Sequence, residues 1–187
     1  SVWDSRSYLN IWIVERILKE ISNGIVIGYA QFPFGSSSAS TDGIMLNYNV
    51  FGQLTPSQNV FNTTTTHEIG HWLNLPHTWG STNEPGLATN CNSDDGVSDT
   101  PNTIGSNWCN YNEVTCGPVA NIENHMEYSS CRKMFTQGQK SRMRTALNST
   151  TGGRSNLITP SNHFATGIDA PAPFCEVDFF ANRYVTC

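Results

Sequence analysis

The chain has 187 residues, enough for one domain with a hydrophobic core and too few for two full ones. Its net charge is −5 and its lysines and arginines are scattered, so no basic stripe predicts binding to nucleic acid or to an anionic membrane. No apolar run is long enough to predict a membrane span. Charged residues make up only 13% of the sequence, about half the usual share, which favours a loop-rich secreted protein.

The cysteines favour disulfides over metal binding. They are even in number, all lie in the C-terminal half, and no C-x-x-C pair or zinc-ribbon spacing is present. We therefore expect an oxidising compartment, and the pairing stays open at this point. The six cysteines are Cys91, Cys109, Cys116, Cys131, Cys175 and Cys187.

Short apolar segments dominate the first part of the chain. Residues 8–14 (YLNIWIV) are rich in β-branched and aromatic residues and predict a strand. Residues 15–22 (ERILKEIS) either extend that strand or form a short helical turn. A second apolar stretch at 24–33 ends at Pro33, and residues 43–52 (GIMLNYNVFG) alternate well enough for a further strand.

A helix is predicted over residues 63–75 (TTTTHEIGHWLNL), with Ile69, Trp72 and Leu73 on its apolar face and one of the threonines as its cap. Residues 76–125 follow as a long, polar, turn-rich segment, with four cysteines in it or just after it. Loops of this length are unusual unless they have a function or are cross-linked, so we expect disulfides to hold this one.

The last regular element is predicted at residues 135–147 (FTQGQKSRMRTAL). Thr136 and Gln139 have the spacing of a capping box, which predicts the start of a helix. Residues 148–156 (NSTTGGRSN) are typical of a helix exit. Residues 169–187 open with a Pro-rich linker and then alternate like a new strand.

The stretch HEIGHWLNLPH contains the candidate metal-binding and catalytic residues. Residues four apart lie on one face of a helix, so His67 and His71 can bind one Zn²⁺ through neutral imidazoles. Glu68 adjoins the first ligand, and its carboxylate can take a proton from a zinc-bound water. The alternative is an amphipathic helix with two histidines and no metal, because so short a motif recurs by accident.

A third histidine favours the metal hypothesis. His77 follows His71 by six residues, so the helix must end and the chain must turn back before His77 can reach the same ion. Asn74 tolerates the left-handed conformation that commonly ends helices. Pro76 cannot continue a helix and favours an extended Leu75. These residues predict that His77 is the third ligand.

The three-histidine spacing resembles the metzincin signature H-E-x-x-H-x-x-G-x-x-H, with Asn74 in place of the glycine. The downstream stretch NHMEYSSC resembles a metzincin Met-turn, which implies that Met126 underlies the zinc site. Tyr128 stands where several metzincins carry a tyrosine that stabilises the oxyanion. Without the triple-histidine motif, Met126 would be an ordinary core residue.

Within the metzincins, the chain is most similar to the pappalysin family and its cytophagalysin-like members. The stretches THEIGHWLNLPHTWG, GVSDTPNT and NHMEYSSCRKMFTQGQKSRM carry this resemblance, which covers about residues 8–147. It implies an α+β fold with a mixed twisted sheet over an active-site helix, and a loop-rich C-terminal subdomain with the Met-turn and a C-terminal helix. It also implies a secreted zinc endopeptidase with a pro-segment in its latent precursor, calcium, and the disulfides Cys91–Cys116 and Cys109–Cys131.

The domain expected at residues 1–168 is the catalytic one, without the N-terminal strand and backing helix that the family usually has. Residues 169–187 resemble a linker and the start of a truncated PKD-type immunoglobulin-like module, in which Cys175 would pair with Cys187. On this interpretation the chain is a proteolytic product of a larger secreted protein.

The leading hypothesis is therefore a zinc endopeptidase acting on proteins or peptides, with Glu68 as the base and Tyr128 near the oxyanion. Residues 43–51 would bind the substrate as an added antiparallel strand. One alternative is a zinc-stabilised binding module without catalysis, which would not need Glu68. Another is a hydrolase whose last ligand is a later glutamate, which leaves His77 unexplained.

An acidic cluster in the stretch CNSDDGVSDTP suggests calcium, which prefers hard oxygen ligands. It contains Asp94, Asp95 and Asp99, and from residues alone a solvated acidic turn would be the simpler interpretation. The family resemblance favours calcium, held by the Asp95 side chain with the Val97 carbonyl and Thr100.

The segment just after the Met-turn is expected to shape the pocket for the substrate residue that follows the cut. Arg132 and Lys133 lie there, and no acidic residue stands between Tyr128 and Phe135. This argues against the preference for basic residues that some relatives show.

Overall fold

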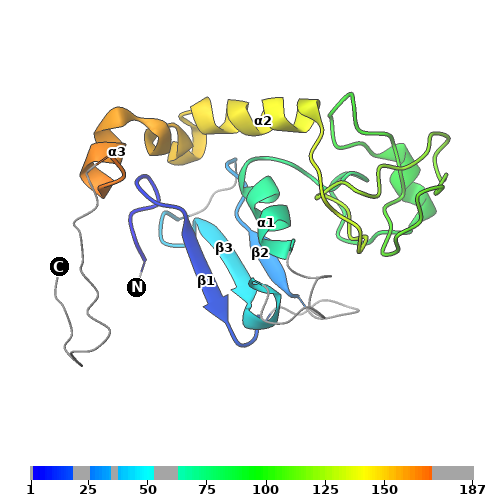
Figure 1. Cartoon of the computed structure of the whole chain (residues 1–187), viewed down its shortest axis with the longest axis horizontal. Helices are drawn as coiled ribbons and strands as arrows, with labels where there is room; N and C mark the ends of the chain where they lie inside the picture. Colours follow the sequence, from blue (N-terminus) through cyan, green and yellow to red (C-terminus); the bar gives the residue numbers. More distant parts are fainter. Residues whose placement is uncertain (1, 19–25, 35–37, 53–62, 170–187) are drawn as a thin grey trace, which may run out of the picture.

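The computed structural model describes residues 2–18, 26–34, 38–52 and 63–169. A small sheet and one helix lie at the centre of these residues, and a turn-rich segment lies at the end of the molecule opposite the C-terminal helix (Figure 1). Four expectations fall wholly or largely outside the described residues: the end of the 15–22 segment, the Pro-rich linker, the PKD-type module and the Cys175–Cys187 pair.

The sheet has three strands in the order β1-β3-β2, formed by Asn10–Val14, Gly43–Asn47 and Gly28–Ala30 respectively. β1 runs parallel to β3 and β2 runs antiparallel to it, with Trp12 and Tyr29 both opposite Met45. The mixed sheet is as expected. The apolar stretch at 24–33 yields only a three-residue strand, and the segment after β3 turns at once into the short 3-10 helix η1 (Tyr48–Val50).

The prediction that residues 43–51 bind the substrate as an added strand is wrong, because β3 lies in the middle of the sheet. β3 is paired with β1 over residues 43–47 and with β2 over residues 44–46, so it has a neighbour on each side and cannot accept a further strand. The outer strand on the side of β3 opposite β1 is β2, which also contacts the helix formed by Thr64–Trp72. An extended peptide can therefore be added beside one of the two outer strands of the described sheet, β1 or β2, and of these β2 lies against that helix.

Helix α1 (Thr64–Trp72) packs on the sheet and forms the core with it. Ile44, Leu46, Val50 and Trp72 are buried together, and each such side chain contributes on the order of 1.5–3 kcal/mol by leaving water. Thr63 occupies the N-cap position, but its side chain makes no capping hydrogen bond, contrary to expectation.

The end of α1 follows the prediction from the sequence. Asn74 has φ 74°, the only positive φ outside glycine in the described residues. The Leu75 N–H donates to the Gly70 carbonyl at 2.9 Å and the Asn74 N–H to that of His71 at 2.9 Å, which is the Schellman pattern. The chain leaves the helix at this point and turns back.

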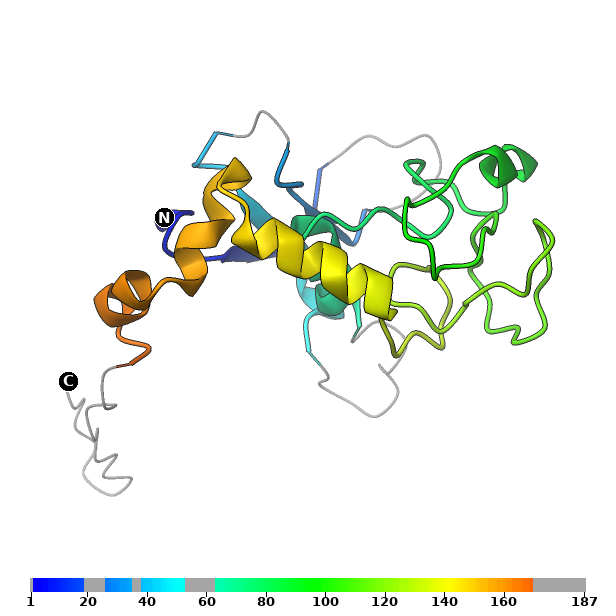
Figure 2. The same cartoon turned by 90° about the horizontal axis from the view of Figure 1, so that it is seen from above.

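The segment between α1 and the next long helix has little regular structure beyond the 3-10 helix η3 (Ala88–Asn92). Disulfides join Cys91 to Cys116 and Cys109 to Cys131, the pairing that the family resemblance implies. Helix α2 (Gln137–Asn148) then begins with the predicted capping box of Thr136 and Gln139. It runs back along the molecule towards η4 (Thr151–Ile158) and α3 (Pro160–Thr166) (Figure 2).

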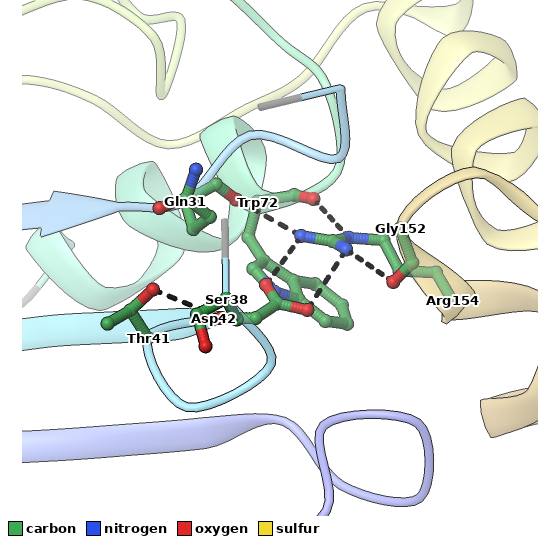
Figure 3. Close-up of polar contacts among 7 residues, drawn as sticks. All are labelled: Gln31, Ser38, Thr41, Asp42, Trp72, Gly152 and Arg154. Atoms are coloured by element: carbon green, nitrogen blue, oxygen red, sulfur yellow. Dashed lines mark hydrogen bonds and ion pairs between the residues drawn. The ribbon is translucent and has the colours of Figure 1, made fainter. Parts of the chain in front are cut away.

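A buried arginine joins this C-terminal part to the sheet and to α1. Arg154 is 1% exposed, and its guanidinium pairs with both oxygens of Asp42, the residue just before β3, at 3.0 and 3.3 Å (Figure 3). It also donates to the carbonyls of Trp72, Gly152 and Gln31 and lies 4.2 Å from the Trp72 ring. Every nitrogen of this charge is satisfied, so its burial is compatible with a stable fold.

Removing one partner of this pair should be strongly destabilising. We expect Asp42→Ala to lower the free energy of unfolding by about 3–5 kcal/mol, because it leaves the Arg154 charge buried and unpaired. The measurement is urea unfolding at constant zinc. The matched control is Asp4→Ala, which breaks the exposed pair with Arg6 and should leave the midpoint unchanged. Equal losses of stability in Asp42→Ala and Asp4→Ala would contradict a stabilising role of the buried pair.

A candidate metal centre beside a buried carboxylate

Three buried histidines converge at the end of α1. His67 and His71 come from the helix, and His77 returns to them after the turn at Asn74. One ligand atom from each lies within 4.8 Å of the others, and the Nε2 atoms of His71 and His77 are 3.1 Å apart. The predicted metal-binding residues are therefore brought together.

A backbone carbonyl fixes the orientation of each ring through its Nδ1 atom. Carbonyl oxygens only accept hydrogen bonds, so each Nδ1 carries the proton and each Nε2 keeps a lone pair. The Nδ1 donors and their acceptors are His67 with the His125 carbonyl at 2.7 Å, His71 with that of Leu75 at 2.6 Å, and His77 with that of Thr82 at 2.9 Å.

These lone pairs fit a divalent cation. Burial lowers the pKa of His71 to about 4 and that of His77 to about 3, and it also lowers the pKa of His67 well below its usual value. With the Nδ1 atoms protonated, the two Nε2 atoms at 3.1 Å have no proton between them and would repel each other. Tetrahedral Zn–N bonds of about 2.0–2.1 Å place two ligand nitrogens roughly 3.3 Å apart, so zinc fits this donor set.

Glu68 lies among the three histidines in sequence but is not one of the convergent ligands. It is 5% exposed, and its Oε2 is buried without a hydrogen-bond partner in the described residues. Burial raises the pKa of Glu68 to about 8, while the charge of Arg132 opposes that rise. Strand β2 approaches closely here, since a Cβ at Gly28 would lie 2.7 Å from Glu68 Oε1.

Met126 packs against α1 between the first two histidines. It is fully buried, and a Cβ at Gly70 would collide with its Sδ atom. Asn124 holds the turn: its Oδ1 accepts from the Met126 N–H at 2.9 Å, and its side chain pairs twice with that of Gln139, at 2.8 and 3.0 Å. The start of α2 thus fixes the position of this turn under the histidines.

Tyr128 lies against the histidine rings. Its ring centroid is 4.9 Å from that of His77 and 5.6 Å from that of His67. Burial, helped by the charge of Glu68, raises the pKa of Tyr128 to about 12. The phenol therefore keeps its proton at neutral pH and remains a hydrogen-bond donor.

Two supports of the site were not found from the sequence. Trp79 is fully buried and stacks on the His77 ring at 4.3 Å, while its indole donates to the same Thr82 carbonyl that orients His77. Glu127 is fully buried, and its carboxylate accepts from the Thr78 hydroxyl and, at 2.9 Å, from the Ser106 N–H. Only an aromatic residue two positions after His77 hinted at the first, and no motif marks the second.

The three residues expected to bind calcium also lie together. Asp95 Oδ1 accepts from the Val97 N–H at 2.9 Å and from the Thr100 hydroxyl at 2.7 Å. Its Oδ2 is buried without a partner in the described residues, and burial raises the pKa of Asp95 to about 6. The Asp99 carboxylate instead accepts from the Gly138 N–H at the start of α2, at 2.8 Å.

Comparisons with known proteins place this histidine cluster and fold in a family of peptidases. The model of the peptidase family described as pregnancy-associated plasma protein-A (Peptidase_M43) matches residues 1–148. The chain belongs to this family, the metzincin-like pappalysins that the motifs indicated.

Curated relatives with this likeness are named extracellular metalloproteases. The chain is 40% identical over 128 residues to an extracellular metalloprotease of Verticillium alfalfae and 36% identical over 130 residues to one of Uncinocarpus reesii. These matches cover 63% and 64% of this chain and 43% of each relative, so the chain spans less than half of their length.

Two solved structures are similar as well. Mature mirolysin of Tannerella forsythia, in complex with a cleaved peptide, has a TM-score of 0.71 and 32% identity, covering 91% of this chain and 62% of that one. Promirolysin has a TM-score of 0.67 and 32% identity, covering 83% and 51%. They share the small mixed α+β sheet with helices.

No helix in the part of the chain that the structure describes is long and apolar enough to cross a membrane.

The contact between Gly70 and Met126 gives a test of the turn beneath the helix. Gly70→Ala should lower the free energy of unfolding by about 1–3 kcal/mol, because the added methyl group collides with the Met126 thioether. In the double variant with Met126→Ala the methyl group has room, so the two effects should be less than additive by at least about 1 kcal/mol. Urea unfolding of all four proteins measures this, and strictly additive effects would contradict the contact.

Proposed function

We propose that this protein is a secreted zinc-dependent endopeptidase. The observation that carries the proposal is the convergence of three uncharged imidazole lone pairs beside a buried carboxylate that has an oxygen free. The two disulfides support an oxidising compartment, and the names of the relatives support extracellular proteolysis. On this proposal residues 1–168 form the catalytic domain.

The proposed zinc ligands are His67, His71 and His77. When bound, zinc supplies a Lewis acid for the scissile carbonyl and lowers the pKa of a coordinated water to about 7. Three protein ligands leave a position open for that water, whereas structural zinc sites are usually closed by four.

Glu68 is the proposed general base. Its pKa is raised only by burial, and the positive charge of a bound cation favours the ionised form that accepts a proton. It then passes that proton to the leaving amine. Tyr128 keeps its own proton and is the proposed donor to the oxyanion.

The proposed substrate is an extended segment of a protein or peptide added beside β2. This strand is one of the two outer strands of the described sheet and lies against Glu68, so a peptide paired there would pass the catalytic carboxylate. The precursor of a similar structure, promirolysin, supports a latent form with a pro-segment. A catalytically inactive zinc-binding module would not need Glu68, so this alternative is not favoured.

One set of variants distinguishes the roles proposed for Glu68, His77 and Tyr128. Glu68→Gln should keep zinc and lose turnover by about 10²–10⁴-fold, because the amide cannot accept the proton. His77→Ala should lose zinc, and Tyr128→Phe should be milder than both. Zinc stoichiometry by atomic absorption is measured beside cleavage of a quenched peptide. Loss of zinc from Glu68→Gln would make Glu68 a ligand, and cleavage near wild type would remove it as the base.

We also propose that calcium binds at Asp95, with the Val97 carbonyl and the Thr100 hydroxyl as further ligands. The unpartnered, buried Oδ2 of Asp95 supports this proposal. The Thr100 hydroxyl donates to the Val97 carbonyl at 2.6 Å, and calcium would have to replace this hydrogen bond. A cation here would brace the loop next to Asn74, because Arg142 bridges the carbonyls of Asn74 and Asp95.

Calcium should raise the melting temperature. At an excess of about 100 times its dissociation constant the expected stabilisation is about 2.7 kcal/mol, or roughly 5–10 °C in Tm for a chain of this size. Thermal unfolding is measured with and without calcium at constant zinc. Asp95→Asn should abolish the response, while the exposed Asp4→Asn should keep it. An unchanged Tm in the wild-type protein would remove this site.

A further inference from the structure

Arg132 is a partly buried cation with too few partners. Its guanidinium makes one hydrogen bond in the described residues, from Nη1 to the Glu127 carbonyl at 3.2 Å. Its Nε is buried without a partner, and it forms no ion pair with any described carboxylate. A guanidinium has five N–H donors, so most of its binding capacity is unused within the described chain.

The two other enclosed arginines among the described residues, Arg142 and Arg154, bind distant parts of the chain. Arg154 satisfies every nitrogen through Asp42 and backbone carbonyls. Arg142 donates through Nε to the Asn74 carbonyl and through Nη1 to the Asp95 carbonyl, both at 2.7 Å. A structural arginine in this fold thus binds through its Nε, whereas Arg132 does not. The difference indicates that Arg132 has another partner.

The position of Arg132 places that partner in the active site. Its Nη1 donates to the Glu127 carbonyl, and the ring of the next residue, Tyr128, lies 5.6 Å from that of His67 and 4.9 Å from that of His77. The nearby carboxylate of Glu127 is already bound to Thr78 and Ser106. The neighbouring Lys133 is largely exposed and pairs with Glu123, so its charge already has a partner at the surface.

We propose that Arg132 is a specificity residue that binds an acidic side chain, aspartate or glutamate, beside the scissile bond of the substrate. The proposal rests on the peptidase function proposed above. A carboxylate matches the planar fork of a guanidinium in two parallel hydrogen bonds and neutralises a charge that is partly removed from water. A neutral side chain leaves that charge unpaired, and a basic one is repelled by it.

The size of the preference follows from the strength of such contacts. Hydrogen bonds to charged groups contribute about 1.5–3 kcal/mol, which corresponds to roughly 10- to 100-fold in kcat/KM. Because a guanidinium stays protonated at any working pH, the preference should persist wherever the substrate carboxylate is ionised.

The test uses the full-length, zinc-loaded protein and quenched peptides that differ only at the two positions flanking the cut, with Glu, Gln or Arg there. At one of these positions wild type should cleave the Glu peptide about 10- to 100-fold faster than the Gln peptide and the Arg peptide most slowly. Arg132→Gln should bring the Glu-to-Gln ratio close to one, and Arg132→Glu should favour the Arg peptide. Lys133→Gln is the matched control and should keep the wild-type ratio.

A second readout does not depend on turnover. The Glu68→Gln variant should bind the uncleaved Glu peptide more tightly than the Gln peptide by calorimetry, and adding Arg132→Gln should remove the difference. An unchanged ratio in Arg132→Gln, or an equal loss in Lys133→Gln, would overturn the role of Arg132. Absence of cleavage for every peptide despite bound zinc would instead overturn the peptidase function.

Discussion

The structure of this protein depends on holding the imidazole lone pairs of His67, His71 and His77 close to one another. Neutral nitrogens at 3.1 Å repel one another unless a cation lies between them, so the fold must fix each ring against that repulsion. It does so with three backbone carbonyls from separate segments, those of His125, Leu75 and Thr82. The carbonyl of Leu75 follows the helix, that of Thr82 lies at the beginning of the long loop, and that of His125 belongs to the turn at Met126. These distant parts of the chain are therefore organised around the histidines.

The long loop can supply these carbonyls because covalent and polar cross-links replace regular structure. Two disulfides close it, with Cα separations of 5.4 and 5.5 Å. Two buried side chains then fix it to its surroundings: Asn124 pairs with the start of α2, and Glu127 binds Thr78 and Ser106. A segment with few strands and helices is thereby held in place and can orient the three histidines, as the proposed metal site requires.

Charge in the active site is balanced over several groups. A buried Glu68 alone would stay protonated near neutral pH, since burial raises its pKa to about 8. The cation that fits the histidines and the guanidinium of Arg132 both favour its ionised form. A second positive charge beside such a cation is unfavourable unless an anion binds it, and Arg132 forms no ion pair with any described carboxylate. An incoming acidic side chain would complete this balance.

The sequence by itself determined the local features. The four-residue spacing of His67 and His71, the left-handed Asn74 that ends the helix, and the capping box of α2 follow from interactions among near neighbours, and the structure contains all three. The two loop disulfides came from family resemblance, because local rules do not pair distant cysteines. Only the tertiary structure decided that β3 lies in the middle of the sheet and not at its edge. It alone decided that Arg154 pairs with the distant Asp42. It also decided that the Nε of Arg132 has no partner in the described residues, whereas Arg142 binds two carbonyls. The reason is physical: strand order and the pairing of buried charges depend on contacts between residues far apart in the chain, which no spacing within a short stretch encodes.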